Sequence, residues 1–368
     1  MGGNLFTIRR YEAEEYRILE VEVLTTLILT LNVRVQGLLY YKNKPSFGDM
    51  DILVESDYLP TNWKQIVIDA FNLQKEQTHS NGNVFSIMYK NFQIDLICMQ
   101  KKYYESAYSY FAYNDLGNLL GRITHKMGIK LGHKGMSLII RPTDSDDHII
   151  GEVELSQNFD DALRVLGLCK SEYDYGFDNI EDIFNFVASS PYFNPEIYLL
   201  DNRNAASRVR DKKRQTYNKF LDWCEHHKDS LRKYNFGTIT EKGGYSLREP
   251  CYSDVVLTHF PEAEEKVNTM IAEYELNQKL AEKLSGGIVM KVTELEGKEL
   301  GIFYKRVKEI LFSKYTKQQL IDMDSNVIEC MIRGIKFCED NGFEYPNVPE
   351  KFAINMIRGN KSSIYEKE

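Results

Sequence analysis

The first hundred residues alternate between helical and strand-like patterns of apolar positions. Apolar residues recur every three or four positions over residues 12–31, which is the period of one helix face, and residues 62–72 show the same period. Strand-like runs separate these helices at residues 33–41, 51–55, 84–89 and 92–99, with a hairpin turn signal at Asn81-Gly82. This order predicts an α+β fold in which helices flank a small mixed sheet.

Helical patterns dominate after residue 100. Residues 103–128 and 180–188 are expected to be helical, with strand-like runs at 136–141 and 149–155 between them. After about residue 200 the chain contains a basic helical run, a glycine-containing stretch at 237–245, a long charged helix from Pro261, and helices that reach Phe337. We therefore divide the chain into residues 1–100, 101–200 and 201–368, the last being a mainly α-helical C-terminal domain.

The composition is that of a globular protein with room for more than one domain. The 368 residues are 43% hydrophobic and 27% charged, and ordinary domains contain roughly 100–200 residues. The most apolar stretch, residues 19–31, contains two glutamates and falls short of the ~20 apolar residues of a membrane span. Because the chain also begins without a signal-peptide pattern, we expect a cytoplasmic protein with no membrane partner.

Net charge and cysteine usage identify no partner. The formal charge of −8 argues against broad attraction to a polyanion, although nucleic-acid enzymes often confine positive charge to one face. The six cysteines are scattered without a CxxC pair, which favours reduced thiols over disulfides or a zinc site. The candidate chemistry must therefore be sought in particular residues.

Two aspartates open one of the predicted strands. The sequence SFGDMDILV at residues 46–54 places Asp49 and Asp51 two positions apart at the start of an apolar run. Residues i and i+2 of a strand point to the same side, so both carboxylates are expected on one face. Gly48 permits a tight turn and the close approach of a ligand directly before them. An isolated pair of this kind is common and usually lies in a solvated turn.

A third aspartate makes this pattern much rarer. Asp95 interrupts the otherwise apolar run of residues 92–97, where a carboxylate is unfavourable unless it binds a cation or is otherwise paired. Mg²⁺ takes oxygen ligands, usually one or two carboxylates together with phosphate oxygens and water. Asp49, Asp51 and Asp95 are therefore the candidate metal ligands and catalytic residues, with Mg²⁺, or Mn²⁺ in its place, as the cofactor.

These residues resemble the metal-binding strands of the family X DNA polymerases, which include DNA polymerase beta, within the nucleotidyltransferase superfamily. The strings GDMDIL at 48–53 and QIDL at 93–96 carry the resemblance. Downstream, Tyr110-Phe111, Asn118 and Arg122 follow at the family's spacing, and residues 181–195 are similar to its thumb-terminal segment. The resemblance covers about residues 34–195. It implies that residues 1–100 hold an N-terminal helix and the palm, and 101–200 the nucleotide-binding and thumb region.

The family implies a two-metal-ion mechanism. By resemblance, Asp49 and Asp51 would bridge both ions, and Asp95 would bind the ion that activates the attacking 3′-hydroxyl. The implied nucleotide-binding residues include the glycine that starts the phosphate loop, the glycine directly before the aspartates, two aromatics against the sugar, an asparagine at the base and a template-facing arginine: Gly37, Gly48, Tyr110, Phe111, Asn118 and Arg122.

The chain departs from the family pattern in three places. Gly37 is followed by Leu38 where the family has Gly-Ser, so we expect Tyr41, Lys42 or Lys44 to substitute in triphosphate binding, with Lys42 included among the nucleotide-binding residues. Tyr113-Asn114 replaces the Gly-Ser turn that follows the family's Tyr-Phe pair. Only a short extension precedes the palm, so we expect no lyase domain of the beta type.

A second candidate surface is basic. Seven lysines and arginines crowd one predicted helix, interleaved with aromatic residues: Arg203, Arg208, Arg210, Lys212, Lys213, Arg214 and Lys219. Arg208, Arg210, Lys213 and Arg214 are the candidate nucleic-acid contacts. The alternative is a solvated helix whose aromatic side chains pack inward.

The leading functional hypothesis is a nucleotidyltransferase that adds nucleotides from an NTP or dNTP to a nucleic-acid 3′ end and releases pyrophosphate, with DNA favoured. A transfer-RNA end nucleotidyltransferase is the alternative enzyme, because residues 293–301 are faintly similar to the helical tails of such proteins. A catalytically silent nucleic-acid-binding module is the alternative from another class, and the retention of three aspartates argues against it. The sequence leaves open whether a template is required.

Overall fold

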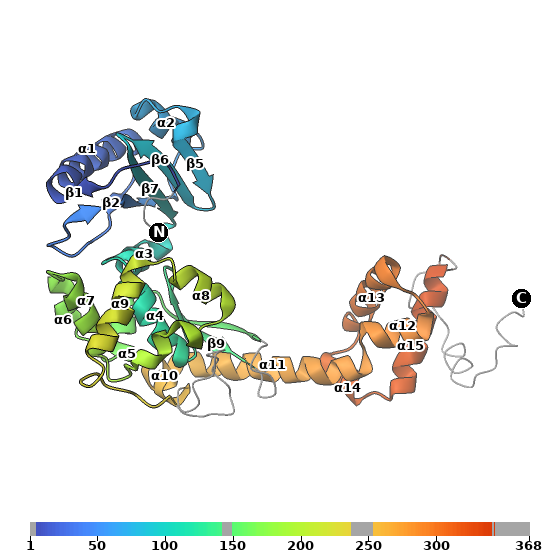
Figure 1. Cartoon of the computed structure of the whole chain (residues 1–368). Helices are drawn as coiled ribbons and strands as arrows, with labels where there is room; N and C mark the ends of the chain where they lie inside the picture. Colours follow the sequence, from blue (N-terminus) through green and yellow to red (C-terminus); the bar gives the residue numbers. More distant parts are fainter. Residues whose placement is uncertain (1–4, 142–148, 237–252, 341, 343–368) are drawn as a thin grey trace, which may run out of the picture. The chain divides into compact units, whose positions relative to one another are not determined.

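The computed structural model of the chain describes residues 5–141, 149–236, 253–340 and 342. By internal contacts the chain divides into two compact units, Met1–Val267 and Asn268–Glu368. Figure 1 shows the elements of each unit. None of the helices in the described part of the chain is long and apolar enough to cross a membrane.

A five-stranded mixed sheet is the centre of the N-terminal part of the first unit. Its strands run in the order β2 (Val35–Gly37), β4 (Asp49–Glu55), β7 (Phe92–Met99), β6 (Val84–Tyr89) and β5 (Thr78–Asn81). β4 and β7 are parallel, and the other neighbours are antiparallel. One face is covered by α1 (Ala13–Leu31) and α2 (Trp63–Ala70), whose apolar side chains share a buried core with those of the strands. The predicted α+β class is therefore confirmed.

Two tight turns fix the register of this sheet. The predicted hairpin between β5 and β6 turns at Gly82, where φ is +58°, so that Asn81 pairs with Val84. β6 and β7 are joined by Lys90 and Asn91, both with positive φ, as the two-residue hairpin turns that match strand twist require. The resulting register sets Asp95 opposite Ser86 on one side and Asp51 on the other.

The segment after β2 is a loop, whereas the sequence pattern predicted a strand over residues 33–41. Leu38 N still donates to Asp51 O of β4 at 3.1 Å, but Lys42 N donates to Phe177 O at 2.9 Å, and Asn43 N to Asp178 O at 2.8 Å. Leu39 O accepts from Tyr113 N at 2.7 Å. These bonds join the sheet to the helices that follow and end β2 after three residues. Two short strands, β1 (Tyr11–Glu12) and β3 (Ser46–Phe47), pair beside the loop.

The helical pattern at 103–128 is divided into α3 (Tyr104–Phe111) and α4 (Leu116–Lys126). The break comes from Tyr113 and Asn114, whose φ values of +55° and +63° cannot continue a helix. A three-stranded antiparallel sheet follows, formed by β8 (Ile129–Gly132), β9 (Gly135–Ile140) and β10 (Gly151–Ser156). Next come α5 (Phe159–Val165), α6 (Lys170–Tyr175) and α7 (Ile180–Ala188), the last with the predicted bounds.

The basic segment forms two helices, α8 (Ala205–Asp211) and α9 (Gln215–His226), where the sequence predicted one. The aromatic residues of α9 are buried: Phe220 stacks with Trp223 at 6.0 Å between ring centroids, and contacts Phe184 and Tyr198 at 5.2 and 4.8 Å. This packing joins α9 to α7 and its neighbours within the compact unit Met1–Val267.

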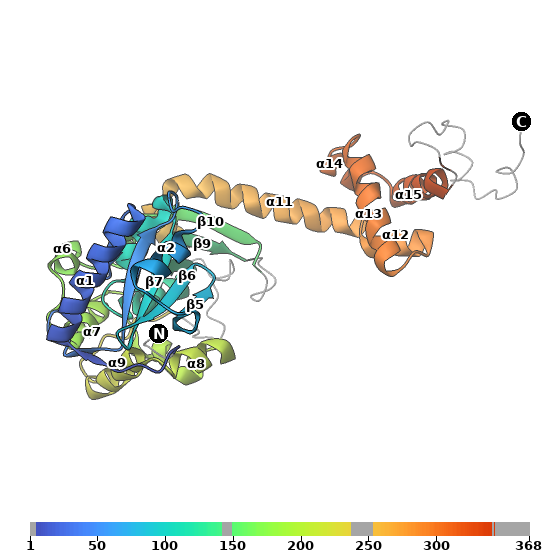
Figure 2. The ribbon, with the colours of Figure 1, turned by 90° about the horizontal axis from the view of Figure 1, so that it is seen from above.

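Helices make up the rest of the described chain. α10 (Ser253–His259) and α11 (Glu264–Lys283) are followed by α12 (Gly286–Thr293), α13 (Gly297–Phe312), α14 (Lys317–Asp322) and α15 (Ser325–Asp340), as Figure 2 shows from above. α12 to α15 share an apolar core that includes Val289, Val307 and Ile332. Short 3₁₀ turns lie at Lys75–Gln77, Lys101–Tyr103, Pro195–Tyr198, Leu200–Asn202 and Pro261–Ala263. The predicted glycine-containing stretch at 237–245 lies outside the described residues.

Candidate functional site

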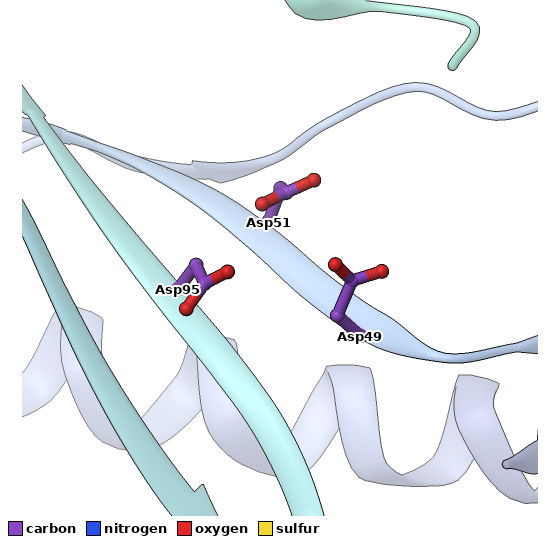
Figure 3. Close-up of side chains that lie close together, drawn as sticks. All are labelled: Asp49, Asp51 and Asp95. Carbon is purple, nitrogen blue, oxygen red and sulfur yellow. The ribbon is translucent and has the colours of Figure 1, made fainter. Parts of the chain in front are cut away.

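The three predicted aspartates meet on the face of the five-stranded sheet opposite α1 and α2 (Figure 3). Asp49 and Asp51 project from β4, and Asp95 lies directly across from Asp51 on the parallel strand β7. One carboxylate oxygen of each residue lies within 4.8 Å of the others. The sheet register therefore produces a cluster of oxygen ligands of the kind that a hard divalent cation takes.

The like charges of this cluster oppose one another. Burial, followed by the neighbouring charges of Asp49 and Asp95, raises the pKa of Asp51 to about 7. The ammonium of Lys44 acts in the opposite direction on Asp51, and burial lowers the pKa of Lys44 itself. A bound divalent cation would remove the repulsion, so the donor set and its electrostatics both fit a metal ion.

Gln93 holds the third aspartate in place. Its Nε2 donates to both oxygens of Asp95, at 3.1 and 3.0 Å, while its Oε1 accepts from the backbone amide of Leu5 at 3.1 Å. The amide side chain thus orients the Asp95 carboxylate without neutralising its charge. The sequence pattern did not single out Gln93, which lies two residues before Asp95 on the same face of β7.

A cleft of about 600 Å³ contains two of these carboxylates and several of the residues predicted to bind nucleotide or nucleic acid. The predicted residues that line it are Asp51, Asp95, Tyr110, Phe111, Asn118, Arg210 and Arg214. The sheet supplies one wall, and α3, α4 and α8 with the start of α9 supply the other. α3 and α4 approach so closely that a Cβ at Gly117 would lie 2.2 Å from Tyr110 O, so glycine is required there.

Other predicted residues are engaged elsewhere. Gly37 pairs with Ile52 in the sheet, and a Cβ there would lie 3.1 Å from Glu20 Oε1. Lys42 Nζ forms an ion pair with Asp178 at 2.7 Å and lies 4.1 Å from the ring centroid of Tyr175. These contacts direct the Lys42 ammonium toward α6 and α7, away from the carboxylate cluster.

Of the four residues predicted to contact nucleic acid, two line the cleft and two do not. Arg210 and Arg214 line the cleft, and Arg214 also pairs with Asp115. Arg208 donates to the backbone carbonyls of Leu200 and Arg203, both at 3.1 Å. Lys213 is exposed outside the lining of the cleft.

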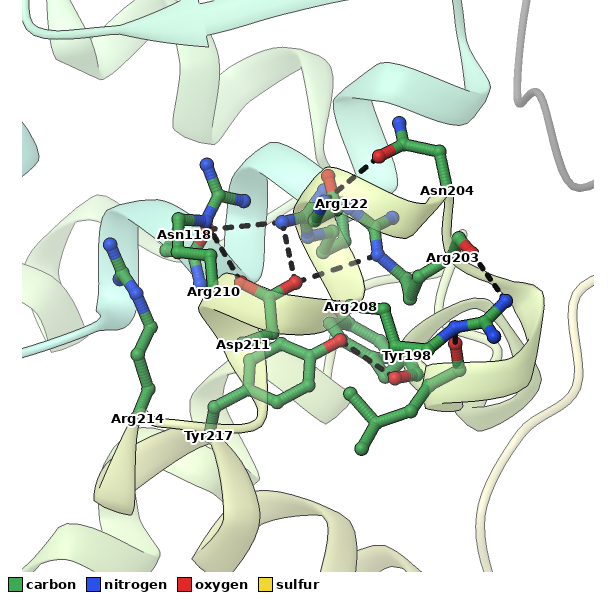
Figure 4. Close-up of polar contacts among 12 residues, drawn as sticks. Asn118, Arg122, Tyr198, Arg203, Asn204, Arg208, Arg210, Asp211, Arg214 and Tyr217 are labelled. Carbon is green, nitrogen blue, oxygen red and sulfur yellow. Dashed lines mark hydrogen bonds and ion pairs between the residues drawn. The ribbon is translucent and has the colours of Figure 1, made fainter.

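Arg122 is buried in a cluster of ion pairs around Asp211 of α8 (Figure 4). The carboxylate of Asp211 has no solvent exposure and lies 3.0 Å from Arg122, 3.5 Å from Arg203 and 3.1 Å from Arg210. Arg122 Nη2 also contacts the side-chain oxygen of Asn118 at 3.4 Å. The amide nitrogen of Asn118 is buried and has no hydrogen-bond partner within the described structure.

One cation beside the carboxylate cluster is not apparent from the sequence. Arg10 donates to the backbone and side-chain oxygens of Ser46, at 3.0 Å and 3.1–3.2 Å, and its Nη1 would lie 3.0 Å from a Cβ at Gly48. The pairing of β1 with β3 brings it there across 36 residues, and no local sequence pattern reveals such a contact. Lys44, which was predicted, lies close enough to Arg10, Asp49 and Asp51 for their charges to affect its pKa.

No protein-family model matches the chain, and no curated protein matches its sequence. The chain is similar to solved structures of Leishmania infantum polymerase beta. With the ternary gap complex the identity is 15% and the TM-score 0.31, and the alignment covers 36% of this chain and 53% of that one. With the ternary P/T complex the identity is 16% and the TM-score 0.34, with 43% and 73% covered. This chain thus spans about half the length of the first. We base the functional proposal on the geometry of the site.

Proposed function

We propose that this protein is a metal-dependent nucleotidyltransferase that transfers a nucleotide from an NTP or dNTP to the 3′ end of a nucleic acid and releases pyrophosphate. The observation that supports this proposal is the cluster of Asp49, Asp51 and Asp95, two of which line a cleft that is also lined by aromatic and cationic side chains. A carboxylate cluster beside cations suits the transfer of a nucleotide from a triphosphate, because divalent ions bind carboxylates and phosphate oxygens together.

The three aspartates would hold two Mg²⁺ ions, with Mn²⁺ as a substitute. Bound there, the ions would neutralise the triphosphate and favour deprotonation of the 3′-hydroxyl. Asp49 and Asp51, two residues apart on β4, would contribute to both ions, and Asp95 would face the side of the attacking hydroxyl. Gln93 would keep the Asp95 carboxylate turned toward that hydroxyl through its two hydrogen bonds.

Arg10 and Lys44 would bind the triphosphate. Both lie beside β4, the strand that carries Asp49 and Asp51, and hydrogen bonds to Ser46 hold the guanidinium of Arg10 over Gly48. Lys44 Nζ contacts Asn114 Oδ1 at 3.4 Å and lies 4.4 Å from the ring centroid of Phe47. These cations compensate for the missing Gly-Ser of the phosphate loop better than Lys42, which already pairs with Asp178.

The helical wall would bind the nucleoside. Tyr110 and Phe111, whose ring centroids are 5.5 Å apart, would pack against the sugar. Asn118, which lines the cleft, would lie beside the base. Arg210 and Arg214 would contact phosphates of the nucleic-acid strand, as guanidiniums commonly do.

A primer-extension experiment tests the proposal. The protein is incubated with labelled DNA or RNA primers and with dNTPs or NTPs, in Mg²⁺, in Mn²⁺ and in EDTA, beside the Asp51→Ala variant. We expect metal-dependent extension by the parent and none by the variant, with DNA and dNTPs as the better pair. Extension confined to RNA with NTPs would favour the RNA-end enzyme. Primer binding with no extension, and no metal-dependent nucleotide binding by calorimetry, would favour the silent module.

A further inference from the structure

The segment Leu5–Arg10 runs beside the starts of both strands that carry the aspartates. The backbone amide of Arg9 donates to Asn91 O at 3.2 Å, directly before β7. The guanidinium of Arg10 donates to Ser46, in β3 just ahead of β4. The segment therefore lies where a contact from its backbone or side chains can reach the groups that surround the carboxylates.

The two ends of this segment are held in different ways. Beyond its last residue, Tyr11 is 4% exposed, its hydroxyl donates to Lys90 O at 2.7 Å, and its ring centroid lies 4.6 Å from that of Phe92. At the other end, Leu5 lines the cleft and is 45% exposed. The contribution of Leu5 to the site is therefore made by its backbone amide and not by a buried side chain.

That backbone amide selects one orientation of the Gln93 side chain. A glutamine amide has a donor end and an acceptor end of similar shape. Leu5 N donates to Gln93 Oε1 at 3.1 Å, so the amino group faces Asp95, to whose two oxygens it donates at 3.1 and 3.0 Å. In the reversed orientation the amino group would face an N–H and the carbonyl oxygen would face a carboxylate. Both contacts would then be repulsive, so Leu5 and Asp95 favour the same orientation.

Burial gives this selection its strength. Gln93 is only 4% exposed, and a buried polar group that loses its partner is unfavourable. Without the Leu5 amide, the Gln93 side chain would be held by Asp95 alone. A divalent cation draws on the same carboxylate oxygens, so it would compete with that remaining contact. The hydrogen bond from Leu5 holds Gln93 in place whatever Asp95 binds.

We propose that the backbone amide of Leu5 is a positioning group of the metal centre, which acts through Gln93 to fix the carboxylate of Asp95. Groups that orient a metal ligand in this way typically change metal affinity by roughly 10- to 100-fold when they are removed. The amide acts on the affinity for the ion and touches neither substrate. This inference rests on the proposed function, because it requires that the aspartates bind a divalent cation.

Mn²⁺ binding to the full-length protein, without nucleotide or primer, tests this role. The free ion is followed by its electron paramagnetic resonance signal, and metal-free Tm is measured in parallel. Leu5→Pro removes the N–H donor, and we expect it to bind Mn²⁺ about tenfold more weakly than the parent at a nearly unchanged Tm. Thr7→Pro is the matched control. It places the same ring at another exposed position of the segment, keeps the Leu5 amide, and should bind Mn²⁺ as the parent does.

A double-mutant cycle shows whether Leu5 acts through Gln93. Gln93→Met has a side chain of similar length without either hydrogen-bonding end, and it too should weaken Mn²⁺ binding about tenfold. If the two groups act as one chain, Leu5→Pro should have no further effect in the Gln93→Met protein.

Three outcomes would contradict the proposal. Parental Mn²⁺ affinity in Leu5→Pro would mean that the amide is not needed. Effects of Leu5→Pro and Gln93→Met that multiply in the double variant would mean that Leu5 acts by another route. Either result would overturn the inference and leave the proposed function standing if the parent extends primers. A parent protein that binds no Mn²⁺ would overturn both.

Discussion

The three clustered aspartates and Asp211 all lie in the first unit, but they differ in how their negative charges are compensated. Asp49, Asp51 and Asp95 lie together, and burial, followed by the charges of Asp49 and Asp95, raises the pKa of Asp51 to about 7. Asp211 is more deeply buried, yet three guanidiniums surround it. The first group could be completed by a cation from solution, whereas the second is completed by arginines of the protein.

This difference separates a functional charge from a structural one. Burying a charge is costly unless it is paired and hydrogen-bonded. Burial and the charges of its neighbours raise the pKa of Asp51 in the metal-free protein, and a bound cation would relieve that repulsion. Asp211 lies among three guanidiniums and joins α8 to α4 through Arg122. Mutation should therefore impair activity at the first group and folding at the second.

The largest expected effect is on activity at the metal centre. Asp51→Ala should reduce the single-turnover rate of nucleotide addition by about a thousandfold or more, because several kcal/mol of transition-state charge stabilisation are lost with the ions. Its metal-free Tm should not fall, since one of three repelling charges is removed. Asp69→Ala on the exposed side of α2 is the matched control and should be fully active. Substantial turnover by Asp51→Ala at ordinary metal concentration would exclude this site.

The corresponding substitution at Asp211 should affect the stability of the folded protein. Asp211→Ala leaves Arg122 and Arg203 buried without their partner, which typically costs about 3–5 kcal/mol. Urea denaturation of the parent and the variant measures this difference directly. A variant of parental stability would mean that the arginines find water or other acceptors, and the distinction drawn between the two groups would fail.

A smaller effect concerns pH. The pKa of Asp51 is raised in the folded protein, so its contribution favours the metal-free fold below its unfolded pKa of ~4 and is lost as pH rises through about 7. Metal-free Tm should therefore decline over this range more in the parent than in Asp51→Asn. Each kcal/mol corresponds to roughly 2–4 °C for a domain of this size.

Mg²⁺ should reverse that trend in the parent, because it binds the ionised carboxylates. The rise in Tm on adding Mg²⁺ should grow between pH 5 and pH 8, and should be much smaller in Asp51→Asn. Thermal melts at matched ionic strength provide the measurement. Equal Mg²⁺ effects at both pH values would mean that proton and metal do not compete at Asp51.

The sequence was sufficient for features that depend on local spacing. The two-residue spacing of Asp49 and Asp51 predicted a shared face, and the apolar run around Asp95 predicted a second strand, which lies beside the first in the sheet. The period of residues 180–188 predicted α7 with its exact bounds. Strand alternation and helix period are properties of short segments, so they are readable without tertiary contacts.

Features that depend on distant contacts were not readable. Arg122 matches a family position by spacing, but its partner Asp211 lies 89 residues away, and only the folded chain reveals that pairing. Tyr113 and Asn114 break a continuous helical pattern because Leu39 O and the packing of the loop stabilise a left-handed turn. The strand predicted over residues 33–41 ends early for the same reason, since the carbonyl of Leu39 accepts from Tyr113 N and the amides of Lys42 and Asn43 donate to Phe177 O and Asp178 O.

The smallest effect tests whether the cationic wall of the cleft contacts nucleic acid. Arg210 and Arg214 line the cleft, while Lys212 and Lys213 lie between them in sequence, exposed and outside its lining. Each phosphate contact releases counterions and contributes roughly 0.7–0.9 to the slope of log affinity against log salt. Changing Arg210 and Arg214 to Gln should therefore flatten that slope by about two contacts and weaken primer binding mainly at low salt. Fluorescence anisotropy over a salt series measures both quantities.

The double change of Lys212 and Lys213 to Gln is the control: it removes the same charge and should alter the slope much less. Equal slopes for the two double variants would mean that the segment attracts nucleic acid only through its overall charge, and the contacts would have to be sought elsewhere in the cleft.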